Sequence, residues 1–403
     1  MKKYHSTKGL MLYLYYILFF MFINISLASF GAYNTEGSYG RYKVVLSMEV
    51  MMILYLLKNY FFFKKITSLP FIVSIWIIWM VFNSLNILGY GIDYYILCLM
   101  DVLLCPLIFL YFYVYFKKKP DMIDSVKVMH IFLLIFSFIL YLSIYKYKSA
   151  GQSAFSPLMN TSYYILLILP WILIIRNKVY NILGIIIISM AVVISMKRTA
   201  SLAFVVSLVV YYLLEQRRVK GIISLRLLLQ VVFLAALIYV LYSYFEQKTG
   251  GYFEQRIASS VYDKGSGRLD IYVHVLKLLA NSNYGAWLYG HGHDTAKIYN
   301  AINGYEALSA HNDWLEIVFD YGLLGFIIYS LFHLFLIRYL WQLLKIRSFY
   351  GSAMAASYVI FFIMSLTSHL VLYPTYYSYL MSFWGVISAL TMNNERKDIS
   401  VQQ

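Results

Sequence analysis

Apolar runs follow one another through almost the whole chain, and this pattern limits the fold more than any other feature. Each run has about 17 to 25 residues, which is long enough for a helix to cross the hydrocarbon core of a bilayer. Because lipid offers no hydrogen-bond partners to backbone groups, each run is predicted to be an α-helix. Only 13% of the 403 residues are charged, against roughly a quarter in a soluble domain. The sequence therefore predicts an all-α, polytopic membrane protein.

About twelve spans are predicted, and the seventh and eighth are separated only by Lys197 and Arg198. The predicted spans are 10–30, 44–63, 68–88, 94–116, 126–147, 161–176, 179–196, 199–214, 224–245, 313–337, 353–372 and 375–392. The first run lacks a convincing cleavage site, so we interpret it as a retained span. Most lysine and arginine residues fall in alternate connections, as the positive-inside rule expects of cytoplasmic loops. This bias predicts that both termini are cytoplasmic.

One long connection departs from a plain bundle and is predicted to be extracytoplasmic. Within it, residues 268–281 have apolar side chains at helical spacing: Leu269, Tyr272, Leu276 and Leu279. We expect a short amphipathic helix there, which lies on the membrane or covers the bundle. The predicted organisation is spans one to nine in 1–245, the extracytoplasmic loop in 246–312, spans ten to twelve in 313–392 and a cytoplasmic tail in 393–403.

The formal net charge of +15 does not indicate a nucleic-acid partner. A nucleic-acid binder gathers its basic residues on one accessible face, whereas here they are scattered between apolar runs. Cys98 and Cys105 are the only cysteines. They are two helical turns apart on one predicted span, which is too far for a disulfide. The partner that composition indicates is the lipid bilayer.

A polar motif opens the tenth predicted span. Residues 310–316 read AHNDWLE, and a G-x-x-G motif follows at 322–325. In a purely structural interpretation, Asp313 caps the helix with Glu316 three residues later, and the glycines let neighbouring helices pack closely. That interpretation does not explain His311 at the mouth of the bundle. Acidic residues inside a span also mark functional sites or buried pairs.

The pattern His-Asn-x-x-Leu-Glu followed by Gly-x-x-Gly, after a large outside loop late in the bundle, resembles the O-antigen ligase and polymerase family. These are bacterial membrane glycosyltransferases that act on lipid-linked glycans. The segments SMKRTA at 195–200, SGR at 266–268 and LYGHG at 288–292 support the resemblance. It implies a polysaccharide polymerase of the bacterial inner membrane, active on the extracytoplasmic face. Its donor would be a glycan on a polyprenyl pyrophosphate, and its acceptor a hydroxyl of another lipid-linked repeat unit.

The resemblance also implies roles for particular residues. Arg198 and Arg268 would neutralise the departing pyrophosphate, because a guanidinium grips phosphate oxygens in a bidentate manner. His311 would take the proton of the attacking hydroxyl. The predicted catalytic residues are His311, Arg268 and Arg198, and the predicted substrate-binding residues are Arg256, Lys197, Asn312, Glu316, Asp313, Trp314 and Trp287. The transfer would invert the anomeric centre and need no nucleotide, metal or other cofactor. A chain-length regulator protein is a further candidate partner.

Each of these residues also has an ordinary interpretation. Lys197 and Arg198 can form an interfacial turn, and the loop arginines Arg256 and Arg268 can pair with neighbouring acids. Trp287 and Trp314 can anchor the protein at the interface instead of stacking on sugars.

His291, His293 and Asp294 have the chemistry of zinc ligands. Their spacing is short and no further Cys/His pair completes the set, so we predict a glycine-shaped turn there and no metal.

Two other functions fit parts of the pattern. A ligase of the same family would transfer the finished glycan to a lipid A core or to protein, with the same residues. A transporter or flippase of lipid-linked glycans would also have twelve spans with both ends inside. Against a transporter, the two halves of the chain show no matching pattern, and the late loop has no counterpart in the first half.

Overall fold

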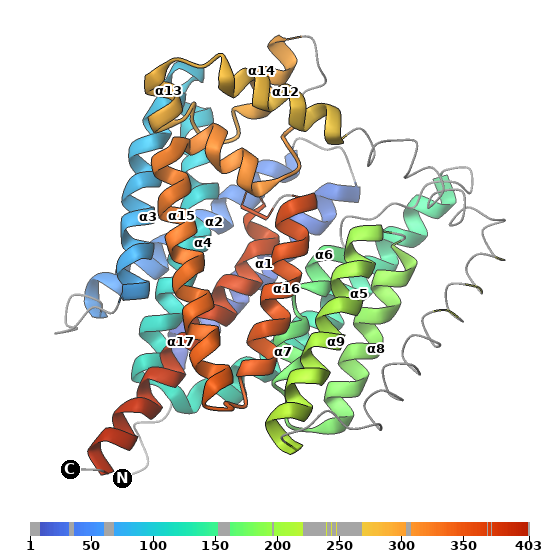
Figure 1. The fold of residues 1–403 in the computed structure, drawn as a ribbon. Helices are drawn as coiled ribbons and strands as arrows, with labels where there is room; N and C mark the ends of the chain where they lie inside the picture. Colours follow the sequence, from blue (N-terminus) through green and yellow to red (C-terminus); the bar gives the residue numbers. More distant parts are fainter. Residues whose placement is uncertain are drawn as a thin grey trace.

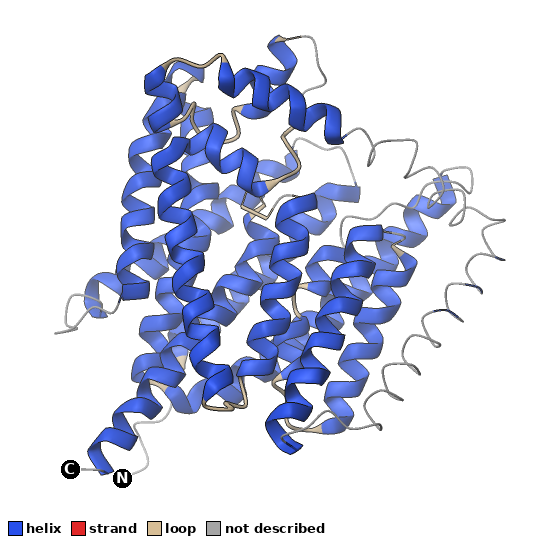
Figure 2. Cartoon of the chain, viewed as in Figure 1, coloured by secondary structure: helices blue, strands red, loops and turns tan. Residues whose placement is uncertain are grey.

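The computed structural model describes residues 9–31, 36–59, 68–151, 162–195, 197–220, 268–303, 308–368, 370–371 and 373–401, together with Tyr239, Ser243 and Gln247. These residues form helices and short connections, and Figure 2 shows no strand among them. The elements before the large loop are α1 (Leu10–Gly31), α2 (Glu36–Asn59), α3 (Ser68–Ser84), the 3-10 turn η1 (Leu85–Tyr90), α4 (Ile92–Lys118), η2 (Pro120–Met122), α5 (Ile123–Gly151), α6 (Ser162–Leu166), α7 (Leu169–Leu173), α8 (Lys178–Ile194) and α9 (Arg198–Lys220). Those that follow are α12 (Arg268–Ala280), α13 (Tyr284–Tyr289), α14 (Ala296–Ile302), α15 (Asp313–Lys345), α16 (Gly351–Thr367) and α17 (Pro374–Val401).

The helices fall where the apolar runs predict them. Every predicted span overlaps one or two described helices except 224–245, which lies almost wholly outside the described residues. Among the residues described, five helical segments are long and apolar enough to cross a membrane: Ser68–Tyr90, Ile92–Lys118, Pro120–Lys146, Arg198–Val219 and Asp313–Lys345. The chain is therefore a helical membrane protein, while the total of twelve spans stays a prediction.

The sixth predicted span, 161–176, is not one continuous helix. It divides into α6 and α7 at a turn over Leu167 and Ile168, because Pro170 follows at the second position of α7. Proline has no backbone N–H and its ring clashes with the carbonyl four residues earlier, so it interrupts a helix. The seventh and eighth predicted spans are two separate helices, α8 and α9.

The centre of the bundle is α4, whose residues from Leu104 to Phe116 are all buried. It packs against α17, α2 and α3 (Figure 1). A Cβ added at Gly385 on α17 would lie 2.6 Å from the carbonyl oxygen of Phe109 on α4. Small residues at helix contacts let two backbones approach in this way. The contact fixes α17 against the central helix.

The helices α12, α13 and α14, here called the lid helices, lie across one end of the bundle. The last residues of α17 lie at the opposite end (Figure 1). The predicted amphipathic helix is confirmed as α12, and only part of its apolar face packs against the protein. Leu269 and Leu276 are 54% and 52% exposed, whereas Val275 and Leu279 are buried and pack with Phe319 of α15. Helix α12 therefore covers the start of α15 and part of α14, while its contact with a membrane surface stays a prediction.

Candidate functional site

The start of α15 holds the predicted motif, and its cap is Asn312. The Asn312 backbone is extended, and its side-chain oxygen accepts hydrogen bonds from the amides of Trp314 (3.0 Å) and Leu315 (3.1 Å). An amide oxygen here satisfies N–H groups that the first helical turn leaves without partners. The purely structural interpretation, in which Asp313 caps the helix in a box with Glu316, is therefore wrong.

Asp313 and Glu316 instead hold neighbouring segments against α15. The Asp313 carboxylate accepts from the amides of Leu370 (2.9 Å) and Val371 (3.3 Å), which connect α16 to α17. Glu316 reaches back and accepts from the amide of Ala310 (3.1 Å). Both side chains are buried. A carboxylate that accepts backbone N–H bonds is stabilised where it lies, so these acids fix the residue before His311 and the connection between α16 and α17 against the start of α15.

Asp320 does the same for the connection between α13 and α14. Its carboxylate accepts from the amides of Asp294 (2.8 Å), Thr295 (3.2 Å) and Ala296 (3.3 Å). The Thr295 hydroxyl donates a further bond of 3.1 Å. The lid helices are thus attached to α15 through one buried carboxylate.

Two glycines bring the lid and α15 into backbone contact. Helix α15 is interrupted at Gly322 (φ 68°, ψ −176°), which meets Gly290 (φ 82°) in the 288–292 segment. A Cβ at either glycine would lie about 2.5 Å or less from backbone atoms of the other segment. The carbonyl groups before the break have donors outside the helix: Phe319 receives the His291 amide (3.1 Å), Asp320 the Gly292 amide (2.8 Å) and Tyr321 the Trp79 indole (3.3 Å). The predicted packing role holds for Gly325, where a Cβ would lie 2.8 Å from the Trp79 indole nitrogen on α3.

His311 lies directly before the cap in a left-handed backbone conformation (φ 55°). Non-glycine residues adopt this region rarely, so the surrounding structure must hold it there. The hydroxyl of Tyr272 on α12 lies 3.1 Å from the carbonyl oxygens of both His311 and Leu366. His311 is partly exposed. The lid and the end of α16 therefore set the backbone that presents its imidazole.

Arg268 begins α12, one turn before Tyr272. Burial raises the pKa of the Tyr272 phenol, and the positive charge of Arg268 opposes that rise. The same guanidinium acts on the phenol of Tyr163 in α6, whose hydroxyl also interacts with the side chains of Thr199 and Ser368. The first residues of α9, the first of α12 and the end of α16 thus meet around Tyr163.

Arg198 is the first residue of α9, next to Thr199, so it begins a helix beside this meeting point. The turn before it is fixed by the Lys197 amide, which donates to the Ser195 hydroxyl (3.3 Å). Both cationic side chains are partly buried. The structure therefore brings the start of α9 to the same end of the bundle as Arg268 and His311. Arg256 lies outside the described residues.

The two histidines of the 291–294 segment have hydroxyl partners, those of His291 in the lid and that of His293 on α15. The imidazole of His291 contacts the hydroxyls of Ser282 (2.8 Å) and Tyr299 (3.2 Å), and that of His293 contacts the hydroxyl of Tyr321. Burial lowers the pKa of His291, and it lowers the pKa of His293 to about 4. Burial therefore favours the neutral form of both imidazoles. In the part of the chain that is described, no three His, Cys, Asp or Glu side chains form a group that could hold a metal.

The two predicted tryptophans differ in their surroundings. Trp314 packs against Tyr329 and Phe361, and its indole donates to the Ser365 hydroxyl (3.1 Å). Trp287 on α13 is 40% exposed. Trp314 therefore supports the packing of α15 on α16, while Trp287 presents an open ring at the surface of the lid.

A second polar cluster was not predicted from the sequence. Arg41 of α2 forms an ion pair with Asp101 of α4 (2.7 Å), and Lys297 of α14 pairs with Asp294. Burial raises the pKa of the Tyr373 phenol, and the charge of Asp294 raises it further, while Lys297 and Arg41 oppose the rise. Tyr373 thus lies among charges from α2, the lid and α15. The available signal was Asp101, an acid inside the predicted span 94–116.

Comparison with known proteins adds one finding. Residues 183–330 match the family model described as O-antigen ligase. No curated protein matches the chain. The matched region runs from within α8 into α15 and includes the lid helices, so it contains Arg198, Arg268 and His311.

Proposed function

We propose that this chain, whose residues 183–330 match the family model described as O-antigen ligase, is a polysaccharide polymerase that acts at the lid end of its membrane bundle. The donor is a glycan on a polyprenyl pyrophosphate, and the acceptor is a hydroxyl of another lipid-linked repeat unit. We further propose that the lid end faces away from the cytoplasm of a bacterial inner membrane.

The observation that supports this proposal most is the meeting of three helix starts. Tyr163 interacts with Thr199 beside Arg198 and lies close to Arg268. One turn after Arg268, Tyr272 contacts the carbonyl of His311. The guanidinium groups of Arg198 and Arg268 and the imidazole of His311 thus belong to segments that contact one another at the lid end of the bundle. Anion-binding groups next to a proton acceptor suit transfer from a phosphorylated donor.

In the proposed reaction, the acceptor hydroxyl oxygen attacks the anomeric carbon of the donor from the face opposite the pyrophosphate. A carbon–oxygen bond forms as the bond to the pyrophosphate oxygen breaks, and the electron pair of the broken bond leaves with the pyrophosphate. His311 accepts the hydroxyl proton, while Arg198 and Arg268 stabilise the negative charge that develops on the leaving group. Attack from the opposite face inverts the anomeric configuration.

Several flanking residues would assist in binding. Asn312, Asp313 and Glu316 fix the segments that present His311, as the hydrogen bonds above describe. Lys197 adds a positive charge beside Arg198, and we propose that Arg256 adds another from the extracytoplasmic loop. Trp287 offers an exposed ring to a sugar, and Trp314 holds α15 in place.

A ligase reaction is the second candidate, because the matched family model is described as O-antigen ligase. The donor and the residues would be the same, and the acceptor would be a lipid A core or a protein. The two candidates therefore differ in acceptor and in the number of transfers on one product.

The test is transfer in a purified system. The full chain is reconstituted in liposomes with a polyprenyl-pyrophosphate-linked repeat unit, with and without lipid A core. A ladder of longer lipid-linked glycans supports the polymerase, and a single transfer to lipid A core supports the ligase. Movement of the lipid-linked unit across the membrane without any new glycosidic bond would contradict both and indicate a transporter.

Metal independence is tested in the same system. Because the arginines neutralise the pyrophosphate in this proposal, a strong chelator should leave transfer intact. Loss of transfer that added zinc or magnesium restores would contradict it.

A further inference from the structure

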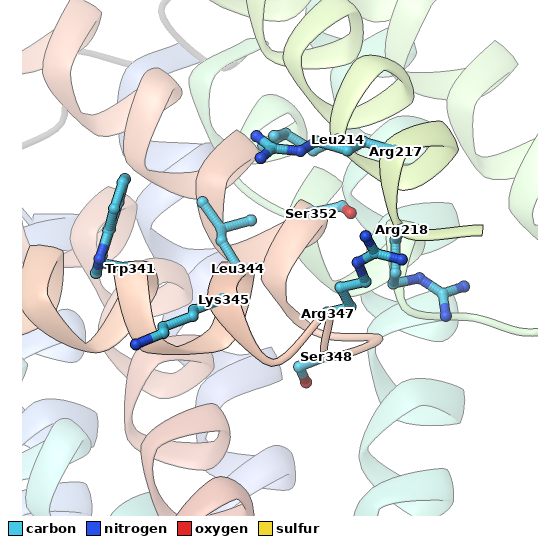
Figure 3. A pocket seen from close by; sticks show the side chains of 9 residues that line it. All are labelled: Leu214, Arg217, Arg218, Trp341, Leu344, Lys345, Arg347, Ser348 and Ser352. Atoms are coloured by element: carbon cyan, nitrogen blue, oxygen red, sulfur yellow. The ribbon is translucent and has the colours of Figure 1, made fainter. Parts of the chain in front are cut away.

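A basic pocket lies at the end of α15 that is distant from His311. It has a volume of about 280 Å³ between α9, α15 and the start of α16 (Figure 3). We call it the basic pocket, and its polar lining is Arg217, Arg218, Lys345, Arg347, Ser348 and Ser352. Helix α15 has 33 residues, which at 1.5 Å per residue separates its ends by more than the thickness of a hydrocarbon core. The pocket is therefore separate from the proposed active site.

The charge in this pocket is unbalanced. Glu215 forms an ion pair with Arg218 (2.5 Å) and accepts a hydrogen bond from Ser352 (3.0 Å), so its carboxylate is already engaged. Within the described part of the chain, no acid lies in ion-pair contact with Arg217, Lys345 or Arg347. Three cationic residues therefore line the space with no described counter-charge, which is the chemistry of an anion site.

The backbone around Arg347 supports the same ligand class. The amide of Arg347 donates to the Leu344 carbonyl (3.2 Å) and that of Ser348 to the Leu343 carbonyl (2.9 Å), the two bonds of a Schellman turn. Arg347 occupies the left-handed position of that turn (φ 51°), where glycine carries no steric penalty. Glycine would suit this backbone position better than arginine. The positive charge at the rim of the basic pocket is therefore the more direct reason for an arginine here.

Helix α16 adds a further attraction for anions. It begins at Gly351 with no side-chain cap, and Ser352 in its first turn lines the pocket. The first amides of a helix, together with its dipole, favour negative charge. This helix end supplements the arginine and lysine side chains.

An exposed tryptophan lies next to the pocket. Trp341, another lining residue, is 71% exposed, one turn before Lys345 at the end of a candidate membrane span. Tryptophan prefers the level of the lipid headgroups, and basic pockets between membrane helices bind anionic headgroups. We propose that the basic pocket binds a phosphate anion, which is supplied by a membrane lipid headgroup or by free phosphate.

The test measures binding to the full chain in detergent. Phosphatidylglycerol, phosphatidylcholine and inorganic phosphate are added in separate titrations, and bound lipid is counted by native mass spectrometry. We expect phosphatidylglycerol to bind at least tenfold more tightly than phosphatidylcholine. If inorganic phosphate at millimolar concentration displaces it, free phosphate is the ligand, and if not, the lipid headgroup is.

Arg347→Gly is the informative variant, because it removes a cation and relieves the left-handed strain. Its melting temperature should equal or exceed that of the wild type, while affinity for the phosphate ligand falls several-fold. Arg217→Gln should weaken binding by a similar factor. Arg338→Gln, which removes an exposed cation of α15 outside the pocket, is the matched control and should leave binding unchanged. Equal binding by wild type, Arg347→Gly and Arg217→Gln, or no binding of either phosphate ligand, would overturn the proposal.

Discussion

The hydroxyl of Tyr272 lies 3.1 Å from the backbone carbonyl oxygen of His311, 39 residues away in the sequence. This contact joins the first lid helix to the residue that precedes the cap of α15. It links the two predicted catalytic residues of the loop region, since Arg268 lies one turn before Tyr272 on the same helix. A change at Tyr272 should therefore affect catalysis without removing any reacting group.

Tyr272→Phe is expected to lower the rate of transfer about three- to tenfold. The lost hydrogen bond is worth about 0.5 to 1.5 kcal/mol, and about 1.4 kcal/mol corresponds to a factor of ten. Transfer is measured with the purified, reconstituted protein at matched amounts. Tyr299→Phe removes another lid hydroxyl, one that contacts His291, and serves as the control. Equal effects of the two changes would show that the Tyr272 contact is ordinary lid packing.

Gly290→Ala should destabilise the protein strongly. The new Cβ would lie 2.3 Å from the carbonyl oxygen of Asp320, at a φ of +82°. A left-handed alanine costs about 1 to 2 kcal/mol before any clash is counted. We expect a loss of at least about 2 kcal/mol in thermal unfolding of the detergent-solubilised protein. Gly89→Ala, where a Cβ would meet nothing within 4 Å, should unfold like the wild type, and similar melting of both variants would contradict the backbone contact.

The stability of the lid should depend on pH through His293. Burial lowers the pKa of this histidine to about 4, whereas an unfolded histidine titrates near 6.5. The unfolded chain takes up the proton first, so stability is greatest above about pH 6.5 and declines as pH falls towards 4, by at most about 3 kcal/mol. Thermal unfolding of wild type and His293→Gln is compared across this range. The variant should show a smaller decline, and parallel curves would exclude His293 as the cause.

The positions of the helices were largely predictable, because apolar runs and helix periodicity are local properties. The breaks within helices were harder to predict from the sequence. Pro170 gave a visible signal for the break between α6 and α7. The apolar pattern of α15 continues through Gly322 and gave no signal for the break there. That break depends on backbone contact with Gly290, which lies 32 residues earlier in the sequence.

In the candidate site, too, some features could be predicted from the sequence and others could not. The motif at 310–316 and the SGR segment at 266–268 led to His311 and Arg268 through the family resemblance, and the catalytic roles of both residues stay predictions. The cap at Asn312 was missed because Asp313 and Glu316 have the spacing of a capping box, and only the contacts of Asp313 with Leu370 and Val371 show that its carboxylate is engaged elsewhere.

The pair of Arg41 and Asp101 was missed because its members are 60 residues apart, and nothing in either local sequence specifies the partner. Their ion pair exists only because α2 packs against α4. Removing one partner leaves the other charge poorly compensated, so Arg41→Gln or Asp101→Asn alone should cost about 2 to 4 kcal/mol. The double variant should recover much of that loss, because the effects of paired charges are not additive. Equal and additive losses in unfolding measurements would show that the pair is not coupled.

The role of His311 can be separated from its effect on structure, because the helix cap is Asn312. A positioned base typically contributes about 10²- to 10⁴-fold to a proton transfer, so His311→Ala should abolish long-chain product while the protein still inserts in the membrane. Alanine, however, is strained at the left-handed φ of 55°, and a loss in His311→Ala alone could reflect a displaced backbone.

His311→Asn removes that ambiguity. Asparagine tolerates the left-handed region well and retains a polar side chain, but its amide cannot accept a proton. We therefore expect His311→Asn to melt like the wild type, to retain lipid-linked donor and to lose at least about 10²-fold in the rate of transfer. Glycan length and donor binding are measured on the same preparation, at matched expression. If His311→Asn produced glycans of normal length, His311 would act only through the backbone, and the arginines Arg198 and Arg268 would remain as the catalytic candidates.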